Sequence, residues 1–177
     1  MANHYLAKNH RFVIQAFKAM HRSDATLLIV GSTDVSYGLR KMVQIAAEYF
    51  YCRFNALLHP TIKIADGQDR HLVVSAYKNA QVFLFGSKVE CAPLVMYESF
   101  AAGVPFVTTD VGNVRDHEEA VTIIGTPEEM AAAALGLLGD PAKLSALREN
   151  GKSIWRDGHE WETIVDRYEA LFKSKTS

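Results

Sequence analysis

The strongest constraint on the fold is a pair of short apolar runs separated by a polar loop and a helix. The first run, Val82 to Phe85, ends in Gly86-Ser87, and a loop then leads to Pro93. Proline suits the first turn of a helix, because its φ angle is already helical and its missing N–H would have no partner there. Gly103 is expected to cap this helix, and the second apolar run begins at Phe106. Two strands joined by a helix predict parallel pairing with a right-handed crossover.

The same alternation covers the rest of the chain. Further strands are expected at Thr26 to Val30, Thr61 to Ala65, Phe106 to Thr108 and Val121 to Ile124. A helix from about Tyr37 to Phe54 carries a predicted core face of Leu39, Met42, Val43, Ala46 and Ala47. Asp69 is placed to cap the next helix. From Pro127 onward the pattern is helical, and the spacing of Trp155, Trp161, Tyr168 and Phe172 suits packing in a core. We therefore predict the α/β class, with a doubly wound parallel sheet and a helical C-terminal segment.

The length, charge and cysteine content of the chain exclude several classes of protein. The 177 residues fit one domain, and the net charge of −1 offers no field that would attract nucleic acid. No stretch approaches the ~20 apolar residues of a transmembrane helix. Cys52 and Cys91 lie far apart and form no metal-binding spacing, which favours reduced thiols in a cytoplasmic protein.

Two glutamates with seven residues between them flank the start of the central helix. Glu90 lies in the loop and Glu98 on the helix; if Pro93 opens the helix, Glu98 lies ~7.5 Å along its axis. Both carboxylates can then line one crevice at the carboxyl end of a strand, where open α/β sheets bind ligands. The free amides of Leu94 and Val95 face the same crevice and suit a phosphate group.

This pattern resembles the signature of the retaining glycosyltransferases of group 1, which have the GT-B fold. The resemblance includes Pro93-Leu94-Val95 inside the glutamate pair and Ala101-Ala102-Gly103-Val104-Pro105 after it. Lys8 to Phe17, Leu27 to Gly31 and Leu72 to Ser87 match further blocks of that family in the same order. The resemblance implies that residues 1–177 form a single Rossmann-like domain, the C-terminal half of the enzyme that binds a nucleotide diphosphate sugar. The N-terminal acceptor domain would be absent from this chain. In the resembling fold the last helix crosses back toward that domain, so part of the C-terminal aromatic face would be exposed here.

The resemblance also assigns roles to residues. Lys8 contacts the diphosphate, Glu98 binds the ribose hydroxyls, and Glu90 contacts the transferred sugar and is the catalytic candidate. Backbone amides for phosphate and sugar would come from the segment Cys91, Ala92, Pro93, Leu94 and Val95. Gly31 either ends its strand or lets the ligand approach the backbone.

Two expected features of the family have no clear counterpart. In the family an arginine usually lies some five or six residues before the lysine that matches Lys8. Here Ala2 or Asn3 stands in that region. The family's first strand would precede Tyr5, so either the chain starts inside that strand or Met1 to Tyr5 supply it.

No metal cofactor is expected, because the chain has no Asp-x-Asp, no Cys-x-x-Cys and no close histidine pair at ligand spacing. The expected partners are the donor, the missing N-terminal domain, and a glycan or lipid acceptor. The full enzyme would be cytoplasmic or peripheral at the inner membrane surface. The chain alone is expected to bind donor and to transfer nothing, since the acceptor would be held by the other domain.

Two alternatives remain open. A nucleotide-sugar epimerase of similar architecture would isomerise its bound donor, whereas a transferase would leave it intact. A non-catalytic α/β binding domain, such as a receiver, would need an acidic cluster at a strand end. The ends at Gly31 and Gly86 offer none.

Overall fold

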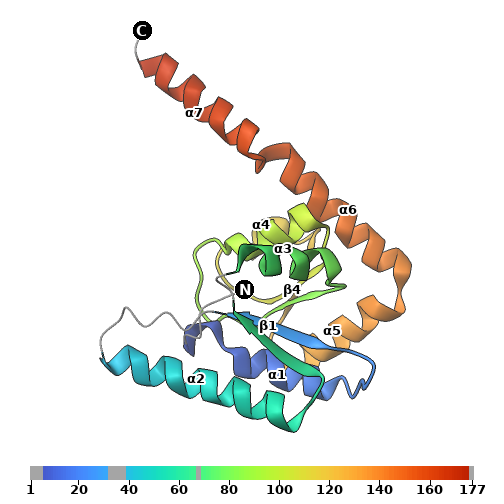
Figure 1. Cartoon of the computed structure of the whole chain (residues 1–177). Coiled ribbons are helices and arrows are strands. Elements are labelled where there is room, and N and C mark those ends of the chain that lie inside the picture. Colours follow the sequence, from blue (N-terminus) through green and yellow to red (C-terminus); the bar gives the residue numbers. More distant parts are fainter. Residues whose placement is uncertain (1–5, 32–38, 67–68, 176–177) are drawn as a thin grey trace.

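The structure is a computed structural model that describes residues 6–31, 39–66 and 69–175 (Figure 1). Helices and strands alternate through most of its length. In chain order they are η1 (Leu6–Lys8), α1 (His10–Ala19), β1 (Leu27–Gly31), α2 (Leu39–Leu58), β2 (Ile62–Asp66), α3 (Arg70–Asn79), β3 (Phe83–Phe85), α4 (Leu94–Ala102), β4 (Phe106–Thr109), η2 (Val114–His117), β5 (Val121–Ile124), α5 (Pro127–Gly139), α6 (Pro141–Gly158) and α7 (Trp161–Lys175).

All strand pairs in the described residues are parallel. β1 pairs with β2, with Leu27 opposite Ile62, and β3, β4 and β5 pair in that order, with Phe83 opposite Phe106. The predicted α/β class with parallel strands and a helical C-terminal segment is confirmed. Hydrogen bonding divides the described strands into two sheets, β1-β2 and β3-β4-β5.

Helices cover both faces of these sheets, as a doubly wound arrangement requires. Figure 1 shows α1, α2 and α5 below the strands and α3 and α4 above them. The core is divided accordingly. Ile14 and Phe17 of α1 pack with Val107 and the buried face of α5, whereas Met96 and Phe100 of α4 pack against the opposite side of β3 and β4.

Local signals explain several element boundaries. The side chain of Asp69 accepts hydrogen bonds from the amides of His71 and Leu72, which confirms the predicted cap of α3. Gly103 ends α4 in the left-handed conformation with φ of 66°. Pro93 is the N-cap of α4 and lies outside the helix, with ψ of 106°, so the helix begins one residue later than predicted.

The predicted core face of the second helix is wrong. Val43, Ala46 and Ala47 are exposed, and α2 instead buries Ile45 and Cys52 together with the polar residues Glu48 and Asn55. The side chains of Leu39 and Met42 and the predicted start at Tyr37 lie outside the described residues. The polar residues are buried because α2 packs on α1, where Arg11 Nε lies 3.0 Å from Glu48 Oε1. Apolar spacing alone does not reveal such an ion pair.

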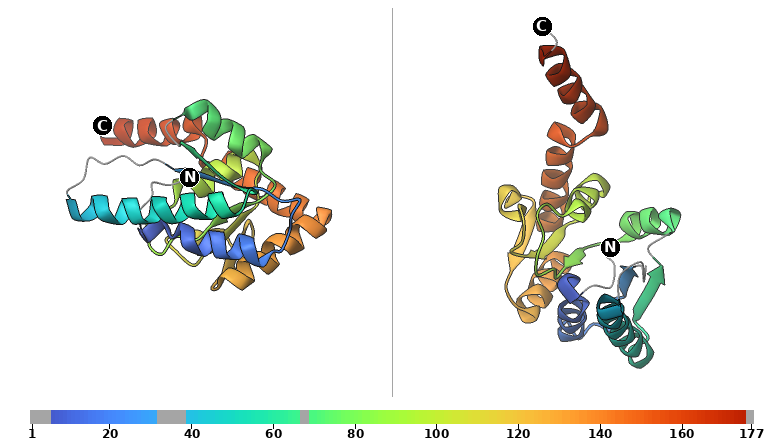
Figure 2. Two further views of the ribbon diagram at one scale, coloured as in Figure 1. Left: turned by 60° about the horizontal axis from the view of Figure 1, so that its bottom comes forward. Right: turned by 90° about the vertical axis from the view of Figure 1, so that its left-hand side faces the viewer.

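The C-terminal aromatic residues join the core only in part. Trp155 is partly buried against the α4 cluster, but Trp161, Tyr168 and Phe172 are exposed. Figures 1 and 2 show the reason, since α7 extends away from the rest of the domain. Its aromatic residues therefore have no core to join among the described residues.

Candidate functional site

Lys8 and Glu90 meet at the carboxyl end of β3. Lys8 Nζ lies 2.6 Å from Glu90 Oε1, and the Ser87 hydroxyl donates to the same oxygen at 2.7 Å. The Glu90 side chain is 13% exposed and that of Lys8 is 28% exposed, so both are largely but not fully shielded from solvent. The pair is therefore a cation and an anion held together at this strand end, each still partly exposed to solvent.

Backbone contacts hold Lys8 in this place. The carbonyl of Ala7 accepts a hydrogen bond from the Lys88 amide at 2.8 Å, and it lies 3.1 Å from the Ser87 hydroxyl. The Thr109 hydroxyl at the end of β4 donates to the Ser87 carbonyl. These bonds join η1 to the loop after β3, so the start of the described chain and the glutamate loop form one unit.

Gly112 supports the glutamate loop from the other side. It has a φ of 59°, and a Cβ at this position would lie 2.5 Å from the Cys91 carbonyl oxygen and 3.3 Å from that of Glu90. A residue without a side chain is therefore required here, because any Cβ would push the loop away.

The N-terminus of α4 opens into the loop. Pro93 has no side chain that could cap the helix, and no side-chain cap is present among the described residues. Leu94 is exposed and Val95 is partly exposed, so their amides lie at an accessible helix end. Such an end carries partial positive charge and favours an anion.

Glu98 belongs to a second cluster, between α3 and α4. The Tyr77 hydroxyl donates to Glu98 Oε2 at 2.8 Å, and Arg70 Nη1 lies 3.5 Å from Oε1. Burial, followed by the charge of Glu98, raises the pKa of Tyr77. The phenol therefore stays protonated and holds one carboxylate oxygen, while the glutamate side chain remains 37% exposed.

The structure thus unites Lys8 with Glu90 and places Glu98 against a separate tyrosine and arginine. Cys91 and Ala92 are exposed in the loop, whereas Gly31 is buried at the end of β1. The replaced arginine position, Ala2 or Asn3, lies outside the described residues.

Four contributors were missed from the sequence: Ser87, Gly112, Tyr77 and Arg70. Ser87 carried a usable signal, because it directly follows a strand at the edge where ligands bind. Tyr77 and Arg70 carried none, since only the packing of α3 beside α4 brings them to Glu98.

The described residues contain no group of three or more histidine, cysteine, aspartate or glutamate side chains arranged to hold a metal ion. None of their helices combines the length and apolar character needed to span a bilayer.

Comparison with known proteins gives a consistent result. Residues 1–140 match the family described as Glycosyl transferases group 1. D-inositol 3-phosphate glycosyltransferase 1 of Catenulispora acidiphila is 34% identical over 103 residues, which are 55% of this chain and 24% of that protein.

Solved structures resemble the fold at low sequence identity. Anabaena Alr3699/HepE in complex with UDP-glucose has a TM-score of 0.77 and 17% identity, over 98% of this chain and 48% of that one. The C-terminal domain of the group 1 family protein LpcC from Francisella tularensis has a TM-score of 0.72 and 15% identity, over 91% of this chain and 84% of that domain. The chain therefore spans a quarter to a half of the full-length proteins and most of the isolated domain.

Proposed function

The chain belongs to the group 1 glycosyl transferases, and we propose that it forms the donor-binding half of such an enzyme. In this proposal it binds a nucleotide diphosphate sugar, whose sugar is transferred with retention to a glycan or lipid acceptor. The acceptor would be held by the other half of the enzyme. The proportion of the relatives that the chain covers supports this division.

The observation that carries the proposal is Lys8 held 2.6 Å from Glu90 beside the accessible N-terminus of α4. A departing diphosphate needs positive charge around it, and a lysine together with helix amides supplies that charge without covalent participation. We propose that Lys8 and the amides of Leu94 and Val95 bind the diphosphate. Metal is not required in this scheme.

Glu90 changes partners in the same scheme. In the structure its carboxylate lies 2.6 Å from Lys8 Nζ and accepts a hydrogen bond from the Ser87 hydroxyl. When the diphosphate takes up part of the lysine charge, Glu90 can accept hydrogen bonds from hydroxyls of the transferred sugar. The ion pair therefore orients the catalytic candidate.

Glu98 would bind the ribose. A carboxylate accepts from two neighbouring hydroxyls, and the Tyr77 hydroxyl fixes its rotamer through one oxygen. Arg70, with a side chain that is 71% exposed, supplies a cation at the same place. It is our candidate for the charge that the replaced arginine would otherwise provide.

The class of donor is supported by a neighbour in structure, because HepE has been solved with UDP-glucose. Calorimetry with uridine, guanosine and adenosine diphosphates and their sugars tests the proposal, each with EDTA and with Mg²⁺. We expect one base to bind, equally in both conditions, and the bound sugar to remain intact and unisomerised. Absence of binding for every nucleotide would refute the donor-site assignment, and isomerisation would favour an epimerase.

A further inference from the structure

Helix α2 exposes its apolar side and buries polar residues. Glu48 is 1% exposed and Asn55 is 4% exposed, and both lie against α1. The opposite side of α2 carries large apolar side chains at the spacing of one helical stripe. Their exposed fractions are 71% for Phe50, 60% for Phe54, 80% for Leu57 and 56% for Leu58. A helix that packs on a domain normally has the reverse arrangement, with its apolar stripe toward the core.

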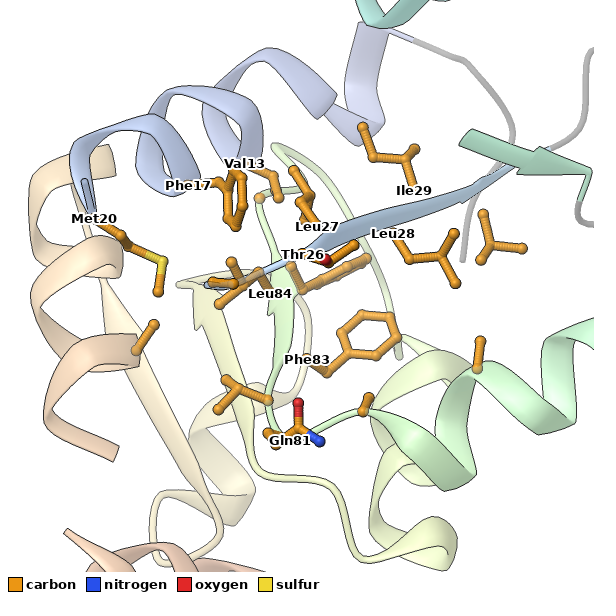
Figure 3. Close-up of a pocket in the computed structure, with 18 of the residues that line it drawn as sticks. Val13, Phe17, Met20, Thr26, Leu27, Leu28, Ile29, Gln81, Phe83 and Leu84 are labelled. Carbon is orange, nitrogen blue, oxygen red and sulfur yellow. The ribbon is translucent and has the colours of Figure 1, made fainter. Parts of the chain in front are cut away.

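The two sides of α1 explain why α2 buries polar residues. Val13, Phe17 and Met20 of α1 point toward the strands and line the apolar cavity beside β1 and β3 (Figure 3). Arg11 and Lys18 lie on the opposite side of α1, because they are separated from Val13 and Phe17 by about half a turn. The surface of α1 that receives α2 is therefore cationic.

Polar contacts with this surface fix the orientation of α2. Arg11 Nε lies 3.0 Å from Glu48 Oε1, and Lys18 Nζ lies 3.4 Å from Asn55 Oδ1. Glu48 Oε2 is buried and has no hydrogen-bond partner among the described residues. α2 thus buries a carboxylate with one oxygen unsatisfied, which is unfavourable, while its phenylalanines remain in contact with water. A continuous apolar surface of this kind indicates a site of interaction with another molecule.

Strand β2 extends the exposed surface beyond the helix. Among the described strands β2 pairs only with β1, so it lies at the edge of its sheet. A groove of about 520 Å³ lies between α2 and β2. Figure 1 shows α2 on the outside of the domain, below the strands, whereas α7 extends from the opposite end. We call this surface the α2 face and define it by its exposed residues, which are Phe50, Arg53, Phe54, Leu57, Leu58 and Lys63.

The charged residues of the α2 face are both cations. Arg53 and Lys63 are exposed and line the groove. Glu48 is the one acidic residue in the sequence of α2, and it is buried. Asp24, three residues before β1, is already paired with Arg22 at 2.6 Å. The α2 face therefore presents apolar and positively charged groups together, which suits a partner that has an apolar interior and an anionic surface.

The charge distribution also separates the α2 face from two other possibilities. α7 has exposed apolar residues too, but Glu162, Asp166 and Glu169 are exposed on the same helix, so anions would be repelled there. A second copy of the chain would fit the α2 face poorly, because a two-fold axis through the groove would bring Arg53 and Lys63 close to the same cations of the other copy.

We propose that the α2 face docks on a lipid bilayer that contains anionic headgroups, with α2 lying in the plane of the interface. Phe50, Phe54 and Leu57 enter the boundary between headgroups and acyl chains, while Arg53 and Lys63 remain at the level of the phosphates. The net charge of −1 supplies no long-range attraction, so binding depends on these two local cations. Neither α2 nor β2 contributes a residue to the candidate site, so the inference does not rest on the donor assignment.

Co-sedimentation of the 177-residue chain with vesicles, without nucleotide, tests the proposal. One set of vesicles is pure phosphatidylcholine, and the other contains roughly 30% phosphatidylglycerol as the anionic lipid. Phe54→Gln with Leu57→Gln removes apolar surface from the α2 face, and Arg53→Gln with Lys63→Gln removes its cations. Glutamine retains helix propensity, so α2 should stay helical in circular dichroism.

The matched control lies on α7. Val165 and Leu171 are 48% and 51% exposed, so Val165→Gln with Leu171→Gln removes exposed apolar surface from a different helix. Hydrogen exchange followed by mass spectrometry then shows which helix the vesicles cover, because amides in contact with the bilayer exchange more slowly.

We expect the chain to bind anionic vesicles about 10-fold or more tightly than neutral ones, and to lose this preference in concentrated salt. Each double variant of the α2 face should weaken binding by about 10-fold, whereas the α7 variant should change it by less than about 2-fold. Vesicles should slow exchange in residues 50–58 and leave residues 161–175 unchanged.

Equal binding to both kinds of vesicle, no binding, or an equal loss in the α7 variant would overturn the proposal. So would a native mass showing a dimer that Phe54→Gln with Leu57→Gln dissociates, since the α2 face would then be an interface between copies. Because no nucleotide is present, these outcomes are independent of the donor-site assignment.

Discussion

Lys8 Nζ lies 2.6 Å from Glu90 Oε1, although 82 residues separate the two in the chain. The contact joins the segment before α1 to the loop after β3. It therefore lies at the place where we propose that the donor binds. Each member of the pair has a different expected ligand group, and that difference can be measured.

Substitution of each partner should separate the phosphate from the sugar. Hydrogen bonds to charged groups contribute ~1.5–3 kcal/mol, so Lys8→Gln should weaken nucleotide diphosphate and nucleotide sugar alike by about 10- to 100-fold. Glu90→Gln should weaken the nucleotide sugar and leave the bare diphosphate within about 2-fold. Calorimetry measures both, with the exposed Lys143→Gln as control. Equal losses of both ligands in Glu90→Gln would show that Glu90 does not contact the sugar.

Gly112→Ala should disturb the glutamate loop from behind. The new Cβ would lie 2.5 Å from the Cys91 carbonyl oxygen at a φ of 59°, and a left-handed alanine costs roughly 1–2 kcal/mol by itself. We expect a Tm lower by several degrees and weaker nucleotide binding. Gly136→Ala is the matched control, because nothing lies within 4 Å of its added Cβ. If both variants behave alike, Gly112 does not position the loop.

The two thiols should differ in reactivity. Cys91 is exposed in the loop, whereas Cys52 is buried, and burial raises the pKa of its thiol to about 12. A chromogenic disulfide reagent should label one thiol in the folded protein and two in denaturant, and Cys91→Ser should remove the fast reaction. Saturating nucleotide sugar should slow labelling of Cys91. An unchanged rate would place the donor away from this loop.

His117 should make stability depend on pH. Burial, and then the charge of His159, lower its pKa, and the Tyr97 hydroxyl lies 3.0 Å from its Nε2. Asp116 and Glu119 oppose this shift. The unfolded chain thus binds the proton more readily, with a pKa of about 6.5, so stability is fully present above that pH and falls as pH drops below it.

His117→Gln provides the comparison, because glutamine can still accept from Tyr97. Tm measured at pH 7.5 and 5.5 should fall less in His117→Gln than in the unaltered chain. An identical fall in both proteins would remove His117 as a cause.

The sequence predicted the parts of the fold that depend on local patterns. Apolar runs and turn residues located the five strands of the described residues to within about one residue, and Asp69 and Gly103 were correctly assigned as caps. The prediction failed where contacts with residues distant in the chain decide whether a side chain is buried. Glu48 is buried because Arg11 reaches it, and Trp161 is exposed because α7 leaves the domain.

The residues of the candidate site also fall into those that a local sequence pattern reveals and those that only tertiary contacts reveal. The glutamate spacing and Pro93 are local, so they were visible in the sequence. Ser87 follows a strand end and could have been found, but its contact with Ala7 and the approach of Gly112 to Cys91 join residues distant in the chain. Tyr77 reaches Glu98 only because α3 packs beside α4. Such contacts have no periodicity that a single sequence displays.

The most direct test of the donor-half account is calorimetry of nucleotide diphosphate binding to Glu98→Ala. Loss of a charged acceptor for the ribose should weaken binding by about 10- to 100-fold with Tm nearly unchanged. Tyr77→Phe should show a smaller loss, because it removes only the group that orients the carboxylate. The exposed Glu128→Ala should bind as the unaltered chain does. Full affinity in Glu98→Ala, with the fold intact, would contradict the account.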